Sequence, residues 1–519
     1  MRRILPSFEF PALASLVLLC ACGPTDRGSY SAMSQLDADL LLTAEQALEW
    51  HAAKDAGGPT YAGNESWLAY LELIESSLRD YGAVDFIKNP WTYDRWHTSD
   101  WPDDSGWSLV SGGEPVRVAH YAANSGSTPE EGVTARLLFY DPADPPESLE
   151  GRIVVFWTRA PDPDFTLGQY QYPSPVDYEY ISDPETFPDI NTPRGVSMEV
   201  TPRPQMRQVG GYISILRDSG AAGALFVLDA GYERLAGLYT FPVNTVFGVP
   251  ALYIDREAGA QVVEHARSER TATLRLVAPV EPTETYQLLA HLPGRDYGTD
   301  QDEMILLVTH TDGPSISQEN GPFGLMGIVH YFSSIPQNER SRTLLLFMDN
   351  RHYMPGAERV FSEQNWFAKH PDAYDRVVGV ISTEHLGQLE YREVGDALEP
   401  TGLVEHSMLH VTNNDQLVGL AIQAVREHDY RRVSVHSVGR LGINGGDQGN
   451  WYGLGGVARR LTVPGAATMG SMGAYWGTSA RLAQFDAEHF VTQVAVMTQL
   501  TAVLMTADLS ELAAEGDNR

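Results

Sequence analysis

Cysteine is nearly absent from this chain of 519 residues. It has two cysteines, Cys20 and Cys22, and both lie close to the N-terminus. The body of the protein therefore cannot contain a disulfide bond, and its stability must come from a hydrophobic core. With 43% hydrophobic residues, the chain is long enough for such a core and for two or more domains.

Positive charge is also scarce, since 36 lysine and arginine residues face 68 aspartate and glutamate residues and leave a net charge of -32. This balance argues against nucleic acid or an anionic membrane surface as a partner. It fits a well-solvated acidic surface, and attraction of cationic ligands is the alternative. After the N-terminal segment no stretch is long and apolar enough for us to expect a membrane span.

The N-terminus has the layout of a signal peptide. Two arginines precede an apolar segment at 11–19, which runs into the letters LCAC at 19–22. These four letters resemble a bacterial lipoprotein signal, which implies that Cys22 is lipidated; an ordinary secretory peptide is the alternative. We expect residues 1–22 to be the signal and 23–36 a tether. The protein would then be exported to the bacterial cell envelope, with the lipid anchor as its only contact with the membrane.

The next part of the chain passes from helical to β patterning. Apolar residues recur at helical spacing at 37–54 and 65–81, and the segment 85–107, rich in Trp, Asp and Pro, is interpreted as an irregular connection. Short apolar runs bounded by turn residues predict four strands, at 135–140, 153–157, 224–228 and 250–254.

A stretch at 159–208, dense in Pro, Tyr and Asp, has no evident secondary structure. So long a stretch is either functional or disordered, and its aromatic residues favour an ordered loop. A lid or substrate wall and a plain surface insertion remain equally open.

The sequences GRIVVFW, LRDSGAAGALFVLDAG and VPALYIDREAGAQVVEHA occur in that order within this β-rich part. Together they resemble the protease-associated (PA) domain, a small β-rich module often inserted into secreted peptidases. The resemblance covers 112–282 and implies that this range is an inserted PA domain.

After residue 282 strands and helices alternate regularly. This alternation predicts an α/β fold with a mainly parallel sheet flanked by helices and with ligands at the carboxyl ends of the strands. The predicted strands are 286–291, 304–308, 343–347, 377–382 and 460–463, and the predicted helices are 323–335, 356–363, 416–428 and 487–504. Residues 283–519 would form this domain, with 37–111 supplying its first helices and a linker.

Chemistry-bearing residues follow the strand at 304–308. His310 and Asp312 are two apart, so in an extended chain they share a face, one as metal ligand and the other as its hydrogen-bonded orienter. Glu319-Asn320-Gly321 comes next and opens a helix. In order and spacing these motifs resemble the di-zinc aminopeptidase family, which also contains glutamate carboxypeptidase and the transferrin receptor. The similarity runs over 286–504.

The resemblance implies one metal held by three residues, His310, Glu319 and Glu384. The other half of the family's site is replaced. Asn350 and Arg351 stand where the family has its base and a glutamate ligand, and Trp476 stands where it has its last histidine. An amide cannot take a proton at neutral pH, so the general base must be new.

Several residues could take over the missing roles. Asp349, His352, His385 and Asp447 are candidate bases, Asp312 is the catalytic partner of His310, and His352 and His385 are more simply neighbours that line the substrate site together with Arg351 and Trp476. Arg351 could pair with the free oxygen of Glu319 or hold a ligand carboxylate with two hydrogen bonds.

The predicted function is a divergent mono-metal hydrolase of amide bonds in a peptide or peptide-like substrate, with the metal activating water and polarising the carbonyl. The cofactor would be one divalent metal, zinc or a harder ion such as manganese or calcium. One alternative is a non-catalytic binding lipoprotein that recognises a ligand or partner through the PA domain and the remnant cleft, with Arg351 in place of a lost metal. Another is a changed reaction on an anionic or sugar-like substrate.

Overall fold

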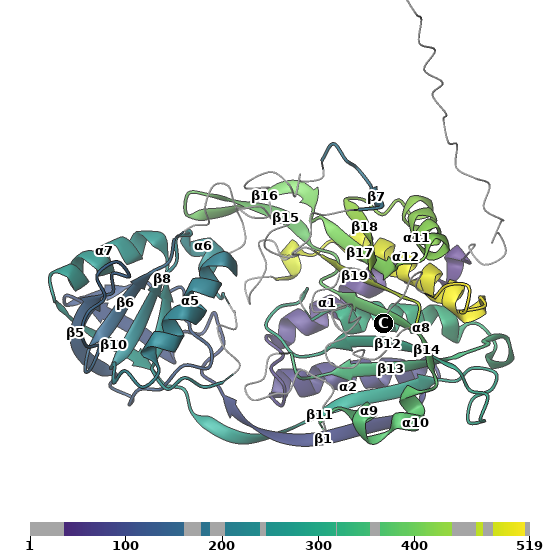
Figure 1. Cartoon of the computed structure of the whole chain (residues 1–519), viewed down its shortest axis with the longest axis horizontal. Helices are drawn as coiled ribbons and strands as arrows, with labels where there is room; N and C mark the ends of the chain where they lie inside the picture. The colour runs from purple at the N-terminus through teal and green to yellow at the C-terminus, as the bar shows by residue number, and fades with distance from the viewer. Residues whose placement is uncertain are drawn as a thin grey trace, which may run out of the picture.

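The computed structural model describes residues 36–159, 178–186, 203–238, 245–317, 319–352, 364–438, 463–470 and 481–513. In these ranges the chain forms two separate sheets, each with its own hydrophobic core (Figure 1). The larger sheet has nine strands in the order β1-β11-β13-β12-β14-β19-β17-β18-β7, and the smaller has eight in the order β3-β2-β10-β5-β6-β8-β9-β4.

The nine-stranded sheet takes its strands from both ends of the chain. They are β1 (Val84–Trp96), β11 (Val280–Leu292), β13 (Thr343–Asp349), β12 (Met304–His310), β14 (Val377–Glu384), β19 (Gly465–Gly470), β17 (Ser407–Thr412), β18 (Val433–Val438) and β7 (Tyr180–Ile181). The central strands β13, β12, β14 and β19 are parallel, and antiparallel strands lie on both sides of them. The predicted α/β fold is confirmed.

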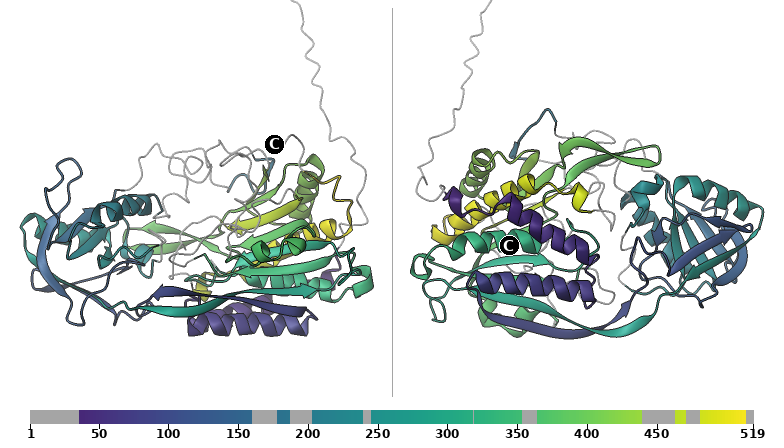
Figure 2. Two further views of the ribbon diagram at one scale, coloured as in Figure 1. Left: turned by 60° about the horizontal axis from the view of Figure 1, so that its bottom comes forward. Right: turned by 180° about the vertical axis from the view of Figure 1, so that it is seen from behind.

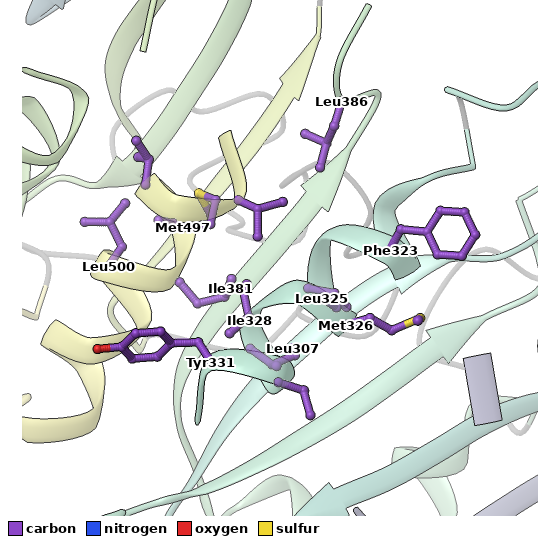
Figure 3. Close-up of a cluster of buried hydrophobic side chains, with 14 of the residues drawn as sticks. Leu307, Phe323, Leu325, Met326, Ile328, Tyr331, Ile381, Leu386, Met497 and Leu500 are labelled. Carbon is purple, nitrogen blue, oxygen red and sulfur yellow. The ribbon is translucent and has the colours of Figure 1, made fainter. Parts of the chain in front are cut away.

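The apolar run of β12 explains why it is central. All seven of its residues are buried, which is typical of a parallel strand covered on both faces. Its side chains alternate between two cores: Ile305 and Leu307 enter one, and Met304, Leu306 and Val308 enter the other. In Figure 3, Leu307 and Ile381 lie close to side chains of α8 and α12, two of the helices that pack in the first of these cores.

Helices surround this sheet (Figure 2). They are α1 (Ala44–Gly57), α2 (Glu65–Asp80), α8 (Gly321–Ser333), α9 (Trp366–Lys369), α10 (Pro371–Tyr374), α11 (Asp415–Glu427) and α12 (Ala487–Thr506), with short 3-10 turns at Ala38–Leu40, Gln337–Glu339 and Leu482–Gln484. Among the described residues, α12 is long and apolar enough to cross a membrane by length and composition, and 78% of its most apolar window is buried within the protein.

The eight-stranded sheet is built from residues between β1 and β11. Its strands are β2 (Trp107–Ser111), β3 (Glu114–Val116), β4 (His120–Tyr121), β5 (Val133–Phe139), β6 (Ile153–Trp157), β8 (Gly223–Val227), β9 (Ala251–Ile254) and β10 (Thr271–Leu276), and its helices are α5 (Arg203–Leu216), α6 (Tyr232–Leu235) and α7 (Arg256–Arg267). That this unit is a PA domain remains a prediction.

Two connections join the units. The first is the long antiparallel pairing of β1 with β11, which continues from the large sheet toward the small one (Figure 1). The second is the hairpin of β15 (Leu389–Val394) and β16 (Ala397–Val404), whose tip contacts α6. Asp396 at this tip accepts a hydrogen bond from Arg117 at 3.0 Å.

Two sequence predictions are wrong, and a third is not tested. The segment 85–107 is not irregular throughout, because β1 occupies Val84–Trp96 and is held by its long ladder with β11 despite its Pro and Asp content. Most of the strand expected at 460–463 lies outside the described residues, and the strand described in this region is β19, whose small residues allow close approach: a Cβ built on Gly465 would come within 2.3 Å of Val380. Helix α5 begins at Arg203, inside the stretch that showed no regular pattern.

Another part of the Tyr-rich stretch joins the large sheet. Tyr180 and Ile181 form β7 and pair antiparallel with β18 at the sheet's edge. Most of the remaining stretch lies outside the described residues, as does the helix expected at 356–363. The choice between lid and surface insertion therefore stays open.

Candidate functional site

Three of the predicted site residues end adjacent strands. His310 is the last residue of β12, Asp349 of β13 and Glu384 of β14. His310 and Asp349 are direct partners across the parallel pairing. Their side chains therefore lie at the carboxyl edge of the sheet, where open α/β folds bind their ligands.

His310, Glu384 and His385 converge on one point. The Nε2 atom of His310 lies 2.8 Å from Glu384 Oε1, and the Nε2 atom of His385 lies 3.3 Å from the same oxygen. All three residues are buried, and their ligand atoms lie within 4.8 Å of one another. His385 has a positive φ of 52°, a conformation that L-residues seldom adopt and that is frequent at functional sites.

The electrostatics of this group couple its members. Burial lowers the pKa of His310, but the carboxylates of Glu384, Glu319 and Asp312 outweigh it and raise that pKa to about 9. Burial raises the pKa of Glu384, but His385 and His310 outweigh it and hold that pKa well below its usual range. At neutral pH the group thus holds a carboxylate and an imidazole proton that a cation could replace.

Glu319 lies outside this group of three. Its Oε2 accepts a hydrogen bond from the backbone of Ser315 at 2.8 Å and lies 3.9 Å from the Nζ of Lys54. Its other oxygen, Oε1, is buried and has no hydrogen-bond partner among the described residues. Burial raises the pKa of Glu319 to about 7, although Lys54 and His310 oppose the shift.

Lys54 is the cation that the sequence analysis missed. It reaches the site from α1, is buried, and donates a hydrogen bond to the Ser315 carbonyl at 2.8 Å. Burial lowers its pKa to about 8, with Glu319 acting in the opposite direction. A signal was present in the sequence, because His51 and Lys54 share the buried face of α1 with Ala47 and Trp50 at helical spacing.

Arg351 does not pair with Glu319, contrary to one of its two predicted roles. It donates to Asp349 instead, from Nε at 2.8 Å and from Nη2 at 2.7 Å. Asp349 also accepts from the side chain of Gln287 and from the Asn350 backbone. Burial raises the pKa of Asp349, but Arg351 outweighs it and lowers that pKa, so Asp349 is a poor proton acceptor at neutral pH.

The orienting hydrogen bond expected between Asp312 and His310 is not formed. Asp312 Oδ1 accepts from the backbone of His352 at 3.1 Å, and His310 Nδ1 has no hydrogen-bond partner among the described residues. The ring of His352 stacks on that of His310 with 4.0 Å between centroids. His352 is therefore a neighbour of the group, as expected. Asp447, Trp476 and Cys22 lie outside the described residues.

Asn350 is confined by structural contacts. Its amide donates to the Thr285 hydroxyl and accepts from the indole of Trp91 at 3.4 Å.

A second missed residue, Glu405, lies at the same edge of the sheet, buried just before β17. Its Oε2 would be 3.5 Å from a Cβ built on Gly470, whose backbone donates to the His385 carbonyl.

These residues fit one metal ion better than two. Two histidines and one glutamate with an open fourth position form a known catalytic zinc set, and the ~3.3 Å expected between ligand atoms of tetrahedral zinc is close to the spacing around Glu384 Oε1. In the other half of the site, Lys54 lies against Glu319 and Arg351 is bound to Asp349. A second cation would meet two positive charges there.

Comparison with known proteins identifies the fold but no relative in sequence. No family model matches the chain, and no curated protein matches it. The solved structure of a peptidase M28 precursor from Shewanella amazonensis SB2B aligns at 16% identity with a TM-score of 0.59, covering 91% of this chain and 98% of that one.

Two aminopeptidase structures give the same result. BSAP, a zinc aminopeptidase from Bacillus subtilis, aligns at 14% identity with a TM-score of 0.55, and the alignment covers 92% of this chain and 100% of the BSAP chain. An aminopeptidase from Aneurinibacillus sp. strain AM-1 aligns at 14% identity with a TM-score of 0.51, and the alignment covers 92% of this chain and 96% of that one. At such low identity the alignment demonstrates the fold alone: this chain has the fold of zinc aminopeptidases and M28 peptidases.

Proposed function

We propose that the protein is a divergent hydrolase of amide bonds in peptide-like substrates that works with a single metal ion, most simply zinc. The observation that supports this is the convergence of His310 and His385 on Glu384 Oε1 at 2.8 and 3.3 Å. The lipid anchor predicted at Cys22 would hold the enzyme at the cell envelope.

In this proposal His310, Glu384 and His385 hold the ion. A divalent ion supplies Lewis-acid polarisation of a carbonyl and lowers the pKa of water. The proton acceptor is Glu319, because its pKa near 7 allows it to take up and release a proton at neutral pH. Lys54, 3.9 Å away, tunes that pKa by opposing the effect of burial.

The alternative, a binding lipoprotein without catalysis, has an observation of its own. Lys54 and Arg351 already neutralise Glu319 and Asp349, so that half of the site needs no metal. A buried pair of this kind needs no catalytic role to be retained, because removing one partner leaves an uncompensated buried charge.

Metal content separates the two functions. The chain without its signal peptide, purified after incubation with zinc and desalted, is expected to carry about one metal per molecule and to cleave a peptide amide slowly. Elemental analysis by mass spectrometry gives the stoichiometry. A folded protein that retains no zinc, manganese or calcium would contradict the hydrolase and leave the binding function.

Metal binding is expected to depend on pH through His310. Its pKa is about 9 in the metal-free fold, so at pH 7 it must release about one proton to bind a metal. The apparent affinity should rise ~tenfold per pH unit toward pH 9 and then level off. The ion pair between His310 and Glu384 makes its full contribution to the stability of the metal-free fold below pH 6.5. That contribution is lost as pH rises through about 9, where His310 loses its proton.

Calorimetric zinc titrations at pH 7, in buffers of different ionisation enthalpy, count the released protons. His352→Ala is the matched control, since this ring stacks on His310 without belonging to the ligand group. Zinc uptake that releases no proton would show that His310 is not a ligand.

A further inference from the structure

A pocket lies where the two units of the protein meet. Its enclosed volume is about 30 Å³, room for one or two waters or a carboxylate group, and it opens to solvent. Four aromatic and two charged residues dominate its lining: Tyr61, Tyr93, Arg95, Trp96, Asp100 and Tyr121. Tyr61 precedes α2, Tyr93 to Trp96 end β1, and Tyr121 belongs to β4 of the smaller sheet. We name these six residues and the space between them the junction pocket.

Two hydrogen-bond donors in the junction pocket lack acceptors. Arg95 Nε is buried, and no described residue accepts a hydrogen bond from it or forms an ion pair with Arg95. Trp96 is only 8% exposed, and its Nε1 likewise has no acceptor among the described residues. Donors buried without partners cost free energy, so a ligand that supplies acceptors would be stabilised there.

Asp100 determines which acceptor suits the pocket. Asp100 interacts electrostatically with Arg95, but the two side chains form no ion pair within the described structure. The guanidinium therefore remains available to a ligand, whereas a dianionic group such as phosphate would be repelled by the carboxylate of Asp100. A monoanionic carboxylate matches the planar fork of arginine and can accept two hydrogen bonds from it.

The junction pocket adjoins the candidate site. Thr60, next to Tyr61, pairs with Gly313 through backbone hydrogen bonds of 2.9 and 2.8 Å. The Tyr93 hydroxyl donates to the Ala62 carbonyl at 2.7 Å. The wall of the junction pocket is thus linked by hydrogen bonds to the loop that continues from His310.

We infer that the junction pocket binds the terminal carboxylate of a short peptide, with Arg95 and Trp96 Nε1 as donors and the tyrosine rings against the adjoining side chain. The inference rests on the proposed function only in taking the ligand to be one end of the substrate. It gives the protein a preference for a free C-terminal carboxylate near the bond to be cleaved.

The test compares an acid with its amide. N-acetyl-tyrosine and N-acetyl-tyrosinamide differ only in the carboxylate, and their binding is measured by calorimetry on the metal-free chain. The acid is expected to bind at least ~10-fold more tightly. Arg95→Gln should weaken the acid ~10- to 100-fold and leave the amide unchanged, and Trp96→Phe should weaken it a few-fold.

Arg136→Gln is the matched control, because Arg136 is an exposed arginine in β5 with its side chain 67% accessible. Thermal melting verifies that each variant is folded. Equal binding of acid and amide, no loss in Arg95→Gln, or no binding to the folded wild type at millimolar concentration would each overturn the inference.

A further variant separates this inference from the proposed function. His310→Ala should lose the metal and still bind N-acetyl-tyrosine, which supports the junction pocket whatever the chemistry of the site. Zinc binding without any preference for the acid would overturn the pocket alone and leave the hydrolase standing.

Discussion

His385→Ala is expected to weaken zinc binding more than ~100-fold, beyond the 10- to 100-fold loss typical when a residue supporting a metal ligand is removed. The reason is the position of its Nε2, 3.3 Å from Glu384 Oε1 in the group that it forms with His310. His310→Ala should have the same effect. Glu319→Gln should keep the metal and lose activity, because Glu319 lies outside the group and acts in the proposal as proton acceptor.

This result decides between two ligand sets. The resemblance to di-zinc aminopeptidases implies Glu319 as the third ligand, whereas the proposed function assigns that role to His385, which lies beside Glu384 and His310. Competition with a zinc-binding dye measures the affinities, with His352→Ala as the control that should retain the metal. If Glu319→Gln released the metal and His385→Ala did not, the set implied by the resemblance would be correct.

Lys54→Met is expected to lower the free energy of unfolding by ~1–3 kcal/mol at neutral pH, because the buried Ser315 carbonyl loses its donor, and by more above pH 7, where the buried carboxylate of Glu319 is ionised without its cation. The loss should shrink in acid, since Glu319 has a raised pKa and becomes neutral as pH falls below about 7. The double variant Lys54→Met/Glu319→Gln removes both charges and should recover most of the stability.

Urea unfolding followed by circular dichroism measures these changes, with the urea dependence of the free energy compared between variants. Lys88→Met is the control, because Lys88 forms an exposed ion pair with Glu75 at 3.0 Å and should cost at most ~1 kcal/mol. A wild-type midpoint for Lys54→Met would mean that the pair contributes nothing to the fold.

Local sequence patterns were sufficient for three central strands, β12, β13 and β14, which are buried on both faces. The apolar runs at 304–308, 343–347 and 377–382 predicted these strands, and each strand extends two residues further, to the polar residue that ends it: His310, Asp349 and Glu384. The spacing of motifs also predicted the fold class, which similar solved structures share. These features could be predicted because the period of a strand is local.

The sequence by itself therefore determined the α/β architecture and the edge of the sheet where the polar residues gather. Only the tertiary structure decided which of them meet: His385 turned toward Glu384 by a positive φ, Arg351 bound to Asp349, and Lys54 brought from α1 to Glu319. Lys54 and Glu319 are far apart in the chain, and no local period links them. Their contact exists because α1 and the loop before α8 pack in the same core, which is decided by the fold as a whole.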